Sequence, residues 1–383
     1  MDELYMKQAL MLAAQGLGRT SPNPVVGAVI VADGSIVGQG WHQAAGTPHA
    51  EVHALAQAGR LARNATLYVT LEPCCHHGRT GPCTDAIIAA GVKRVVVAMT
   101  DPNPLVRGKG IQKLRQHGLE VLEGVCAAEA AQLNEVFIKW IATGLPFGVL
   151  KTAITLDGKI ATYTGHSKWI TSERSREYVH GLRNMYDAIL VGIGTVLADD
   201  PSLTTRLPGG GKNPIRVIVD SKGRIPLEAK LLCDCEAPVI IAVGPEASAE
   251  KLAALQAKGA EVLTLPLVAG RGVSLRHLFV ELGQRNITSI LVEGGAEVNA
   301  SVLAENVVDK VHWFIAPKII GGKTAPGPVG GLGLSDMAQA TVLEDMQVKN
   351  IGKDILLTAY MQRREGRDVY RTCGRIGNSE GHS

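Results

Sequence analysis

The sequence predicts an α/β protein with two domains. Strand-like apolar runs alternate with helical segments along most of its 383 residues, which is typical of mainly parallel sheets covered by helices. A chain of this length exceeds one ordinary hydrophobic core. Gly-Leu-Pro at 144–146 ends a helical segment, and an apolar strand follows. We therefore expect domains at 1–144 and 145–362, followed by a disordered tail at 363–383 that is rich in Arg, Gly and Ser.

The first half alternates between the two periodicities. Apolar residues with helical spacing predict a helix within 1–15, and Asp33-Gly34 predicts a hairpin turn. The expected strands are 25–31, 36–40, 67–71, 95–99 and 120–123. Further helices are expected from Pro48 to Gly59, from Cys83 to Gly91, from the 101–104 loop to His117, and over 126–143.

The second half continues this alternation and predicts a sheet with helices on both faces. The expected strands are 147–155, 188–191, 216–220, 239–243, 261–265, 289–292 and 310–316. Two late segments, 342–350 and 355–362, predict a final hairpin.

Composition narrows the class of protein. With 46% hydrophobic and 20% charged residues, the chain is globular. A net charge of +3 argues against a nucleic-acid partner. No apolar run approaches the roughly 20 residues that span a bilayer, and the first 15 residues are unlike a secretory signal, so we expect a cytoplasmic protein with no membrane partner. The seven cysteines fit reduced thiols better than a disulfide framework.

Histidine, cysteine and glutamate gather between residues 48 and 83, in PHAEVHA and EPCCHHGRTGPC. Zinc binds imidazole nitrogen and thiolate sulfur, and a catalytic zinc site keeps a fourth position for water. We expect His49, Cys74 and Cys83 to bind Zn²⁺. Cys83 would also begin a helix, whose N-terminal dipole favours a thiolate. The alternative is a surface histidine pair with ordinary buried thiols.

Glu51 is the expected acid/base residue beside this metal. Zinc makes a bound water nucleophilic near neutral pH, and hydrolytic deamination of an aminopyrimidine also needs a carboxylate that is not a ligand. H-x-E followed by P-C is the pattern of such deaminases. If Thr47 caps the helix and Pro48 lies in its first turn, His49 and Glu51 can both reach an ion ahead of it.

The spacing of the two cysteine ligands departs from the usual P-C-x-x-C. Either Cys75 or one of the two histidines after it replaces a ligand, or a longer loop separates Cys74 from Cys83. The longer loop is preferred, because adjacent cysteines cannot easily share a tetrahedral ion. His76 and Arg79 on this loop are then candidates for binding an anionic or phosphorylated substrate, unless the loop is only a solvated polar segment.

Four other polar residues are candidates for binding the deaminase substrate. Asn23 precedes a buried strand and either holds a base edge by its amide or caps a turn, and His42 has the same two interpretations. Asp101 and Asn103 follow a predicted strand at its carboxyl end, where open α/β sheets place their sites. They either bond the substrate or only begin the next helix.

A glycine turn is the best phosphate-binding candidate in the second half. Gly192-Ile193-Gly194 lacks the third glycine of a dinucleotide fingerprint. At Gly294 and Gly295, a buried strand ends and a helix begins, so backbone amides and the helix dipole favour phosphate. The pyrophosphate of a nicotinamide cofactor would fit there. The alternative is a tight turn with no ligand.

Longer motifs resemble one known family. T-S-P-N-P-V-V-G-A-V-I at 20–30, H-A-E and P-C-C-H-H-G-R-T-G-P-C resemble the deaminase half of the bifunctional riboflavin-biosynthesis deaminase/reductases. Residues 151–159, 167–172 and 192–206 resemble the reductase half. The resemblance covers nearly the whole chain short of the tail. It implies an N-terminal cytidine-deaminase-like three-layer domain and a C-terminal dihydrofolate-reductase-like domain.

The resemblance also implies site residues, and in this family Asn23 contacts substrate. NADPH is expected near Ala153, Trp169, Thr195, Asp199, Ser221, Gly295, Ala296, Glu297, Val298, Asn299, Ala300 and Ser301. The reductase substrate is expected near Ser167, Arg183, Leu203, Arg206 and Glu293. Either arginine can bind a phosphate bidentately, and Lys151 at the start of the sheet could add positive charge.

The resulting hypothesis is a bifunctional enzyme acting on a phosphorylated pyrimidine. The N-terminal domain would deaminate 2,5-diamino-6-(5-phosphoribosylamino)pyrimidin-4-one, and the C-terminal domain would reduce the ribosyl chain to ribityl by hydride transfer from NADPH. Lys151, Asp199 and Glu293 are candidates for the acid in the second step. The family also implies a homo-oligomer held through the reductase half.

Two other functions stay open. One is a nucleoside or transfer-RNA deaminase fused to an unrelated binding domain. The other is a scaffold with a purely structural zinc site, closed by a fourth ligand.

Overall fold

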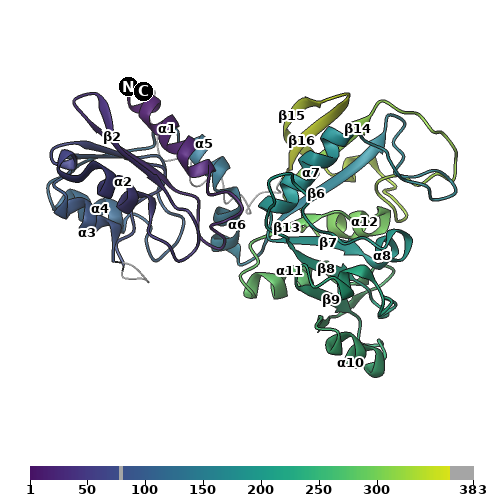
Figure 1. Ribbon diagram of the computed structural model, residues 1–383. Helices are drawn as coiled ribbons and strands as arrows, with labels where there is room; N and C mark the ends of the chain where they lie inside the picture. The colour runs from purple at the N-terminus through teal and green to yellow at the C-terminus, as the bar shows by residue number, and fades with distance from the viewer. Residues whose placement is uncertain (77–80, 363–383) are drawn as a thin grey trace. The chain divides into compact units, whose positions relative to one another are not determined.

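The computed structural model describes residues 1–76 and 81–362 (Figure 1). The described chain divides into two compact units, Met1–Gly144 and a second unit that begins at Leu145. The predicted disorder of 363–383 and the predicted substrate contact of Arg79 lie outside the described residues.

The first unit is built on a five-stranded sheet with the order β2-β1-β3-β4-β5. Its strands are β1 (Gly27–Ala32), β2 (Ser35–Trp41), β3 (Thr66–Val69), β4 (Arg94–Val97) and β5 (Glu120–Glu123). β1 is antiparallel to β2 and β3, whereas β3, β4 and β5 are parallel. The carboxyl ends of β3 and β4 therefore lie next to each other.

Helices cover both faces of this sheet. They are α1 (Asp2–Ala14), α2 (Ala50–Ala58), α3 (Cys83–Ala89), α4 (Lys109–Gln116), α5 (Ala127–Leu133) and α6 (Glu135–Thr143), with a 3₁₀ turn η1 (Gly59–Ala62) after α2. One buried cluster joins α2, α3 and α4 to the sheet, and another joins α1, α5 and α6 to its other face. Alternate strand residues supply the two clusters, as the two-residue period of a strand requires. The three layers match the predicted architecture.

One predicted helix is wrong in detail. The helix expected over 126–143 is interrupted at Asn134, which separates α5 from α6. The buried amide of Asn134 accepts the backbone N–H of Val25 at 2.9 Å and donates to its carbonyl at 3.0 Å. This tertiary pairing has no sequence signature, because its partner lies far away in the chain.

The second unit contains a nine-stranded sheet with the order β10-β9-β8-β7-β13-β6-β14-β16-β15. Its strands are β6 (Phe147–Thr155), β7 (Ala188–Gly192), β8 (Ile215–Val219), β9 (Val239–Val243), β10 (Glu261–Thr264), β13 (Ser289–Val292), β14 (Lys310–Ala316), β15 (Leu343–Ile351) and β16 (Asp354–Met361). In this sheet order, the strands from β10 to β14 run parallel to one another. The predicted β15–β16 hairpin continues the sheet, with β16 antiparallel to both β14 and β15. A small unpredicted hairpin joins β11 (Leu267–Val268) and β12 (Gly272–Val273).

Helices flank both faces of the second sheet, as predicted (Figure 1). They are α7 (Glu173–Met185), α8 (Ile193–Asp199), α9 (Lys230–Cys233), α10 (Ala249–Ala257), α11 (Leu275–Gln284) and α12 (Ala296–Ala304), with a 3₁₀ turn η2 (Met337–Gln339). The core cluster with α11 and α12 lies on one face, and that with α8, α9 and α10 on the other. Consecutive residues of β7 alternate between the two clusters, which fits a strand buried on both faces.

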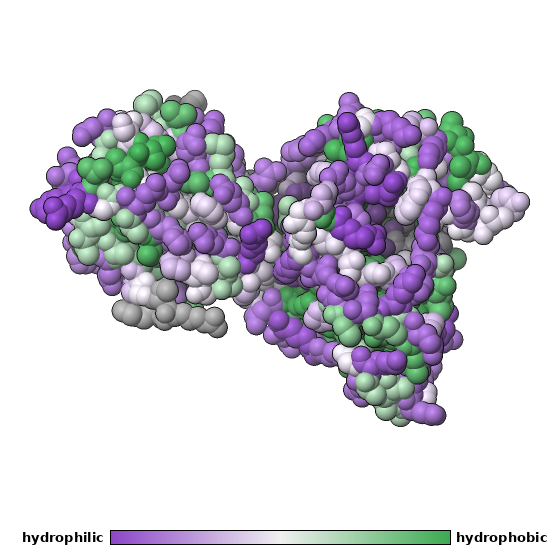
Figure 2. Space-filling model, viewed as in Figure 1, coloured by the Kyte–Doolittle hydropathy of each residue, from purple (hydrophilic) through white to green (hydrophobic). Residues whose placement is uncertain are grey.

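The visible surface of each unit is mixed in character. Figure 2 shows hydrophobic residues in separate groups among hydrophilic ones. None of the helices within the described residues has the length and apolar character needed to cross a bilayer.

Candidate functional site

Three predicted metal ligands come together in the first unit. His49 is the N-cap of α2, Cys83 is the first residue of α3, and Cys74 lies on the segment after β3. Both helices pack on the same face of the sheet, and their N-terminal ends bring His49 and Cys83 into contact. The expectation that Thr47 caps α2 and that Pro48 lies in its first turn is wrong. His49 is the N-cap, Pro48 precedes it, and the Thr47 hydroxyl is bonded to the backbone of Ala44.

The three ligand atoms are close enough to share one ion. His49 Nδ1 lies 3.2 Å from Cys83 Sγ and 3.6 Å from Cys74 Sγ, and all three atoms lie within 4.8 Å of one another. Neither Cys75 nor His76 joins this group within the described residues. The longer-loop interpretation of the cysteine spacing therefore fits the geometry. One imidazole nitrogen and two sulfurs form the donor set that zinc prefers in an open site.

The protonation of these ligands also favours a cation. The hydrogen bond between the two thiols lowers the pKa of Cys74 and raises that of Cys83. In this arrangement Cys74 loses its proton more readily than Cys83 does. The hydrogen bond to Cys74 likewise raises the pKa of His49. A divalent ion would let both sulfurs be thiolates at once.

Glu51 lies in the first turn of α2 and is only 3% exposed. Its Oε2 is buried and has no hydrogen-bond partner in the part of the chain that the structure describes. Burial, together with the nearby Cys74 sulfur, raises the pKa of Glu51 to about 7. A buried carboxyl oxygen without a protein partner is suited to bind a water or a substrate proton.

Asn23 and His42 form a chain of hydrogen bonds that ends beside His49, a predicted metal ligand. Nδ1 of His42 lies 3.2 Å from the carbonyl oxygen of Pro48, and Nε2 lies 3.3 Å from Nδ2 of Asn23. Because a carbonyl can only accept, Nδ1 carries the proton and Nε2 accepts from the asparagine amide. Burial lowers the pKa of His42, in agreement with a neutral ring. This arrangement fixes which end of the Asn23 amide faces away from His42.

Asp101 and Asn103 lie just beyond the carboxyl end of β4, next to the segment that carries Cys74. Asp101 is 7% exposed, and burial raises its pKa to about 6. Its Oδ1 accepts the N–H of Asn103 at 2.8 Å, and Asn103 Oδ1 accepts that of Leu105 at 3.0 Å. Both side chains thus shape their own loop, whatever further contacts they make. His76 lies two residues beyond Cys74, outside the metal group.

In the second unit, the predicted reductase residues follow neighbouring parallel strands. Lys151 and Ala153 lie on β6, Thr195 and Asp199 on α8 after β7, and Ser221 one residue beyond Asp220, which follows β8. Glu293 follows β13, and Gly295, Ala296, Glu297, Val298, Asn299, Ala300 and Ser301 form the start of α12. Ser167 and Trp169 lie between β6 and α7, whereas Leu203 and Arg206 lie between α8 and β8. The strand order β8-β7-β13-β6 brings these carboxyl ends to one edge of the sheet.

A buried ion triad lies at this edge. Glu293, whose side chain is 8% exposed, accepts from Nε and Nη2 of Arg183 at 2.7 and 3.1 Å. Lys151 Nζ lies 3.3 Å from the same carboxylate. Nη1 of Arg183 also donates to the carbonyl oxygen of Thr204 at 3.1 Å. The Nε and Nη2 groups of Arg183, which the sequence predicted to bind a phosphate bidentately, therefore bind Glu293.

Arg206 differs from Arg183 in that its residue is exposed. Its backbone N–H donates to Nδ1 of His180, at 3.2 Å. Burial, with the nearby charges of Arg183 and Arg206, lowers the pKa of His180 to about 4. His180 is therefore neutral, and two residues of α7 hold the loop on which Arg206 lies.

Two predicted cofactor residues make contacts near the loop before α7. Lys168 forms an ion pair with Asp199 at 2.9 Å. Trp169 is 61% exposed, and the guanidinium of Arg176 lies 4.5 Å from the centre of its ring. An exposed indole at this edge offers a flat surface for a planar ligand.

The turn before α12 retains the features of a phosphate-binding site. A Cβ at Gly294 would lie 2.6 Å from the Val298 side chain, whereas one at Gly295 would face open space. Asn299 Nδ2 donates to Pro328, and its buried Oδ1 has no partner among the described residues. The turn thus needs glycine at Gly294 and leaves backbone open at Gly295, which fits a pyrophosphate.

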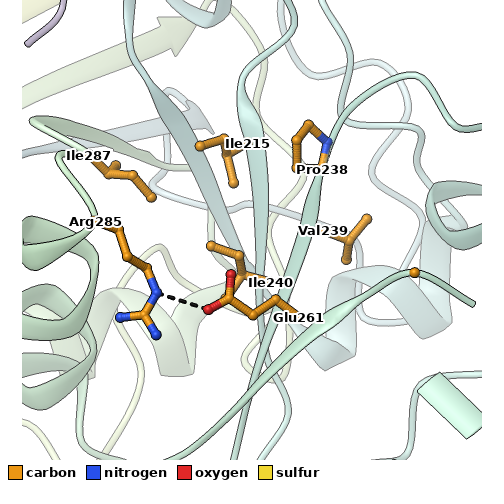
Figure 3. Close-up of a pocket in the computed structure, with 8 residues that line it drawn as sticks. Ile215, Pro238, Val239, Ile240, Glu261, Arg285 and Ile287 are labelled. Carbon is orange, nitrogen blue, oxygen red and sulfur yellow. Dashed lines mark hydrogen bonds and ion pairs between the residues drawn. The ribbon is translucent and has the colours of Figure 1, made fainter. Parts of the chain in front are cut away.

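A cavity of about 530 Å³ lies at the opposite edge of this sheet (Figure 3). Ile215, Val239 and Glu261 line it, and each is the first residue of a parallel strand. Figure 3 shows the ion pair between Arg285 and Glu261 at this cavity. The predicted reductase residues follow the strands at their other ends, so this cavity is separate from the proposed site.

His180 and Glu72 were not predicted from the sequence as site residues. His180 precedes Arg183 by three residues on α7, and this spacing places both side chains on one face of the helix. Glu72 is a carboxylate at the end of a buried strand, directly before the Pro-Cys motif. The sequence thus shows suitable residue types at both positions, but not the distant partners that Glu72 binds.

Comparison with known families accounts for both units. Residues 1–99 match the cytidine and deoxycytidylate deaminase zinc-binding region, and residues 146–357 match the RibD C-terminal domain. The second match excludes the alternative of a deaminase fused to an unrelated binding domain. The predicted cytidine-deaminase-like and dihydrofolate-reductase-like folds are confirmed.

Whole proteins match over nearly their full length. The riboflavin biosynthesis protein RibD of Aquifex aeolicus is 49% identical over 93% of this chain and 97% of its own, and that of Escherichia coli is 43% identical over 93% and 98%. A solved deaminase/reductase of Thermotoga maritima has a TM-score of 0.83 and 41% identity, covering 94% of this chain and 99% of its own. Acinetobacter baumannii RibD has a TM-score of 0.85 and 40% identity, with the same coverage. The chain thus belongs to the RibD family of bifunctional riboflavin biosynthesis proteins.

Proposed function

We propose that this chain catalyses the two reactions for which its Thermotoga maritima relative is named, those of a diaminohydroxyphosphoribosylaminopyrimidine deaminase and a 5-amino-6-(5-phosphoribosylamino)uracil reductase. The deaminase half uses zinc, and the reductase half uses NADPH. One observation carries the proposal for the first reaction: a buried carboxyl oxygen without a protein partner among the described residues lies near an N,S,S donor set in a deaminase fold.

In the deaminase half, we assign the metal to His49, Cys74 and Cys83. A zinc ion bound there supplies the Lewis acidity that activates a water as nucleophile. Glu51 accepts one proton as the water oxygen bonds to the ring carbon and passes it to the adjacent ring nitrogen. It then accepts the proton that remains on this oxygen and donates it to the departing amino group as the carbon–nitrogen bond breaks. The products are a ring carbonyl and ammonia. Its buried Oε2, which has no partner among the described residues, is suited to both transfers.

The substrate would lie between the metal and the surrounding loops. The hydrogen-bond chain through His42 leaves the Asn23 carbonyl oxygen to accept from a ring N–H. Asp101 and Asn103 form another side of this site, an assignment that rests on their position after β4. His76 and Arg79 are assigned to the phosphate from the sequence motif alone, because Arg79 lies outside the described residues.

In the reductase half, the carboxyl edge of the sheet would hold both ligands. The turn at Gly294 and Gly295 fits the cofactor pyrophosphate, and Trp169 offers a stacking surface. Arg206 is exposed and is our choice for the substrate phosphate, supported by the N–H groups of Arg183 that Glu293 and Thr204 leave open. Lys151 can contact the substrate while it remains paired with Glu293.

The two reactions can be followed separately. The full chain, loaded with zinc, is given the phosphoribosyl diaminopyrimidine, and ammonia release and NADPH absorbance are recorded. We expect ammonia without NADPH, and NADPH oxidation only after deamination. Glu51→Gln should lower ammonia release by about 10²- to 10⁴-fold and leave reduction of the deaminated compound unchanged. Normal ammonia release by this variant at full zinc content would refute the assignment.

Self-association is proposed through the second unit. β15 is the last strand of its sheet, so one of its edges is unpaired within the sheet. It carries exposed apolar residues, among them Met346 and Val348 at 63% and 64% exposure. Such an edge is a natural place for a second copy to pair. Light scattering should give at least a dimer for the wild type and a smaller mass for Val348→Lys, and an unchanged mass would contradict this interface.

The proposed compartment is the cytoplasm, which fits the free thiols of the described cysteines. Cell fractionation of the expressed protein tests this directly, and recovery with secreted proteins would contradict it.

A further inference from the structure

The buried carboxylate of Glu72 accepts hydrogen bonds from four backbone N–H groups. Glu72 is 3% exposed and lies two residues before Cys74. Its Oε2 accepts from Asp101 at 3.1 Å and from Gly108 at 2.9 Å. Its Oε1 accepts from Gly110 at 2.9 Å and from Ile111 at 3.2 Å. With two donors on each oxygen, the carboxylate acts only as an acceptor.

These donors belong to both ends of one loop. The loop leaves β4, contains Asp101 and Asn103, and enters α4 at Lys109. A capping role at α4 alone would engage only the donors near the helix start. The bond from Asp101 shows that Glu72 also holds the beginning of the loop. It thereby closes residues 101–111 into a loop of fixed shape.

Two glycines let the backbone approach this carboxylate. Gly108 has φ +76°, which L side chains rarely adopt. A Cβ at Gly110 would lie 2.0 Å from the carbonyl oxygen of Pro73. The loop is therefore packed directly against the residue between Glu72 and the proposed ligand Cys74. The backbone of Glu72 adds a bond to Met99 at 3.0 Å, on the segment after β4.

We propose that Glu72 is a positioning residue of the deaminase, one that fixes the 101–108 loop relative to Cys74 so that the loop forms one side of the pyrimidine site. This inference rests on the proposed function. Glu72 does not touch the reacting atoms; it acts through the loop. Loss of the hydrogen bonds between Glu72 and the loop should therefore weaken substrate binding while the metal stays in place.

Glu72→Gln tests the inference with almost no change in volume. The amide NH₂ replaces one oxygen and faces two N–H donors, so half of the cradle is lost. We expect the KM for ammonia release to rise about tenfold to a hundredfold, kcat to change less than KM, and zinc content to stay at the wild-type value. NADPH oxidation with the deaminated compound should not change.

Glu305→Gln is the matched control. Glu305 accepts from Ser274 Oγ and from the N–H groups of Leu275 and Arg276 at the start of α11, in the other unit. It is a comparable capping carboxylate without a link to the metal segment. This variant should leave the deamination KM unchanged.

If the Glu72→Gln protein does not fold, a second pair of variants tests the same inference. Gly108→Ala keeps the carboxylate and strains the loop where Glu72 holds it, since its φ is +76° and nothing lies within 4 Å of the new Cβ. Gly118→Ala, with φ +82° and equally open space at the far end of α4, imposes the same strain elsewhere. We expect a raised KM for the first variant and not for the second.

Three results would overturn the inference. An unchanged KM in Glu72→Gln, or in Gly108→Ala if the former does not fold, would show that the loop does not form the site. A loss of activity that follows zinc content, with KM unaltered, would make Glu72 a support of the metal alone. A wild-type protein that releases no ammonia under these conditions would refute the proposed deaminase, and this inference with it.

Discussion

Arg183 donates from Nε and Nη2 to the two carboxylate oxygens of Glu293, and Lys151 contacts the same carboxylate. Burial opposes the charge of Glu293, but the two cations outweigh burial and lower its pKa to about 2. Glu293 is therefore ionised at neutral pH. This pairing argues against Glu293 as the proton donor among the three acids proposed for the reduction.

Glu293→Gln is expected to damage the reductase half in both stability and activity. Removing one partner of a buried ion pair leaves the other charges uncompensated, at a cost of about 3–5 kcal/mol. Chemical denaturation should show this loss of stability in the second unit. The rate of NADPH oxidation should also fall by at least about tenfold, because an increase of about 1.4 kcal/mol in the activation free energy of reduction slows it tenfold.

Glu281→Gln provides the comparison for this variant. Glu281 forms a partly exposed ion pair with Arg285, and surface pairs contribute about 0–1 kcal/mol. A loss of stability in Glu293→Gln no greater than in Glu281→Gln would mean that the triad does not act as a buried charged unit.

The sequence was sufficient to predict features that depend on local pattern. The H-x-E spacing placed His49 and Glu51 at the start of a helix, and the structure brings His49 together with Cys74 and Cys83. Alternating strands and helices predicted the second sheet with helices on both faces. These features follow from side-chain periodicity and turn residues within short windows.

Features that depend on distant partners were missed or misjudged. The break between α5 and α6 depends on bonds from Asn134 to Val25, and the start of α4 depends on Glu72. The fork of Arg183 was assigned to a phosphate because nothing nearby in the sequence shows that Glu293 engages it. Single-sequence patterns do not encode such pairings, which only the folded sheet brings about.

Cys74 and Cys75 provide a sharp test of the metal centre. Cys74 belongs to the N,S,S group, whereas Cys75, its neighbour in the chain, does not within the described residues. We expect Cys74→Ser to lose bound zinc and ammonia release, and Cys75→Ser to keep both. Metal analysis and ammonia assays check this, with NADPH oxidation expected to be normal in each variant.

Removal of the metal from the wild type should act on the same reaction. A chelator is expected to abolish ammonia release and leave NADPH oxidation unchanged, with recovery on adding Zn²⁺.

Zinc loss in Cys75→Ser comparable to that in Cys74→Ser would instead implicate Cys75 as a ligand.

His312 makes the second unit sensitive to acid. Burial, with the nearby charge of Lys310, lowers its pKa to about 4 from an ordinary value of 6.5. Below pH 6.5 the unfolded chain takes up a proton that the folded one refuses, so the free energy of unfolding falls as pH drops toward 4. The full loss is roughly 3 kcal/mol, at about 1.4 kcal/mol for each unit of pKa difference.

Denaturation curves of the second unit at pH 7.5 and pH 5 measure this effect. His312→Gln should show a smaller fall in stability between the two pH values than the wild type. His180, whose pKa is also lowered to about 4, adds to the fall in the same direction, so the variant retains part of it. An equal fall in wild type and variant would exclude His312 as a cause.

Asn23 and His42 should act as one unit in substrate binding. His42 Nδ1–H donates to Pro48, which leaves Nε2 to accept from Asn23 and turns the Asn23 carbonyl oxygen toward the proposed substrate. Asn23→Ala and His42→Ala should each raise the deamination KM by about fivefold to thirtyfold, the range of a hydrogen bond worth roughly 1–2 kcal/mol. Because His42 acts through Asn23, the double variant should be little worse than Asn23→Ala alone. Kinetics of the four proteins measure the coupling, with zinc content as the control, and effects that simply multiply would show that His42 contacts the substrate independently of Asn23.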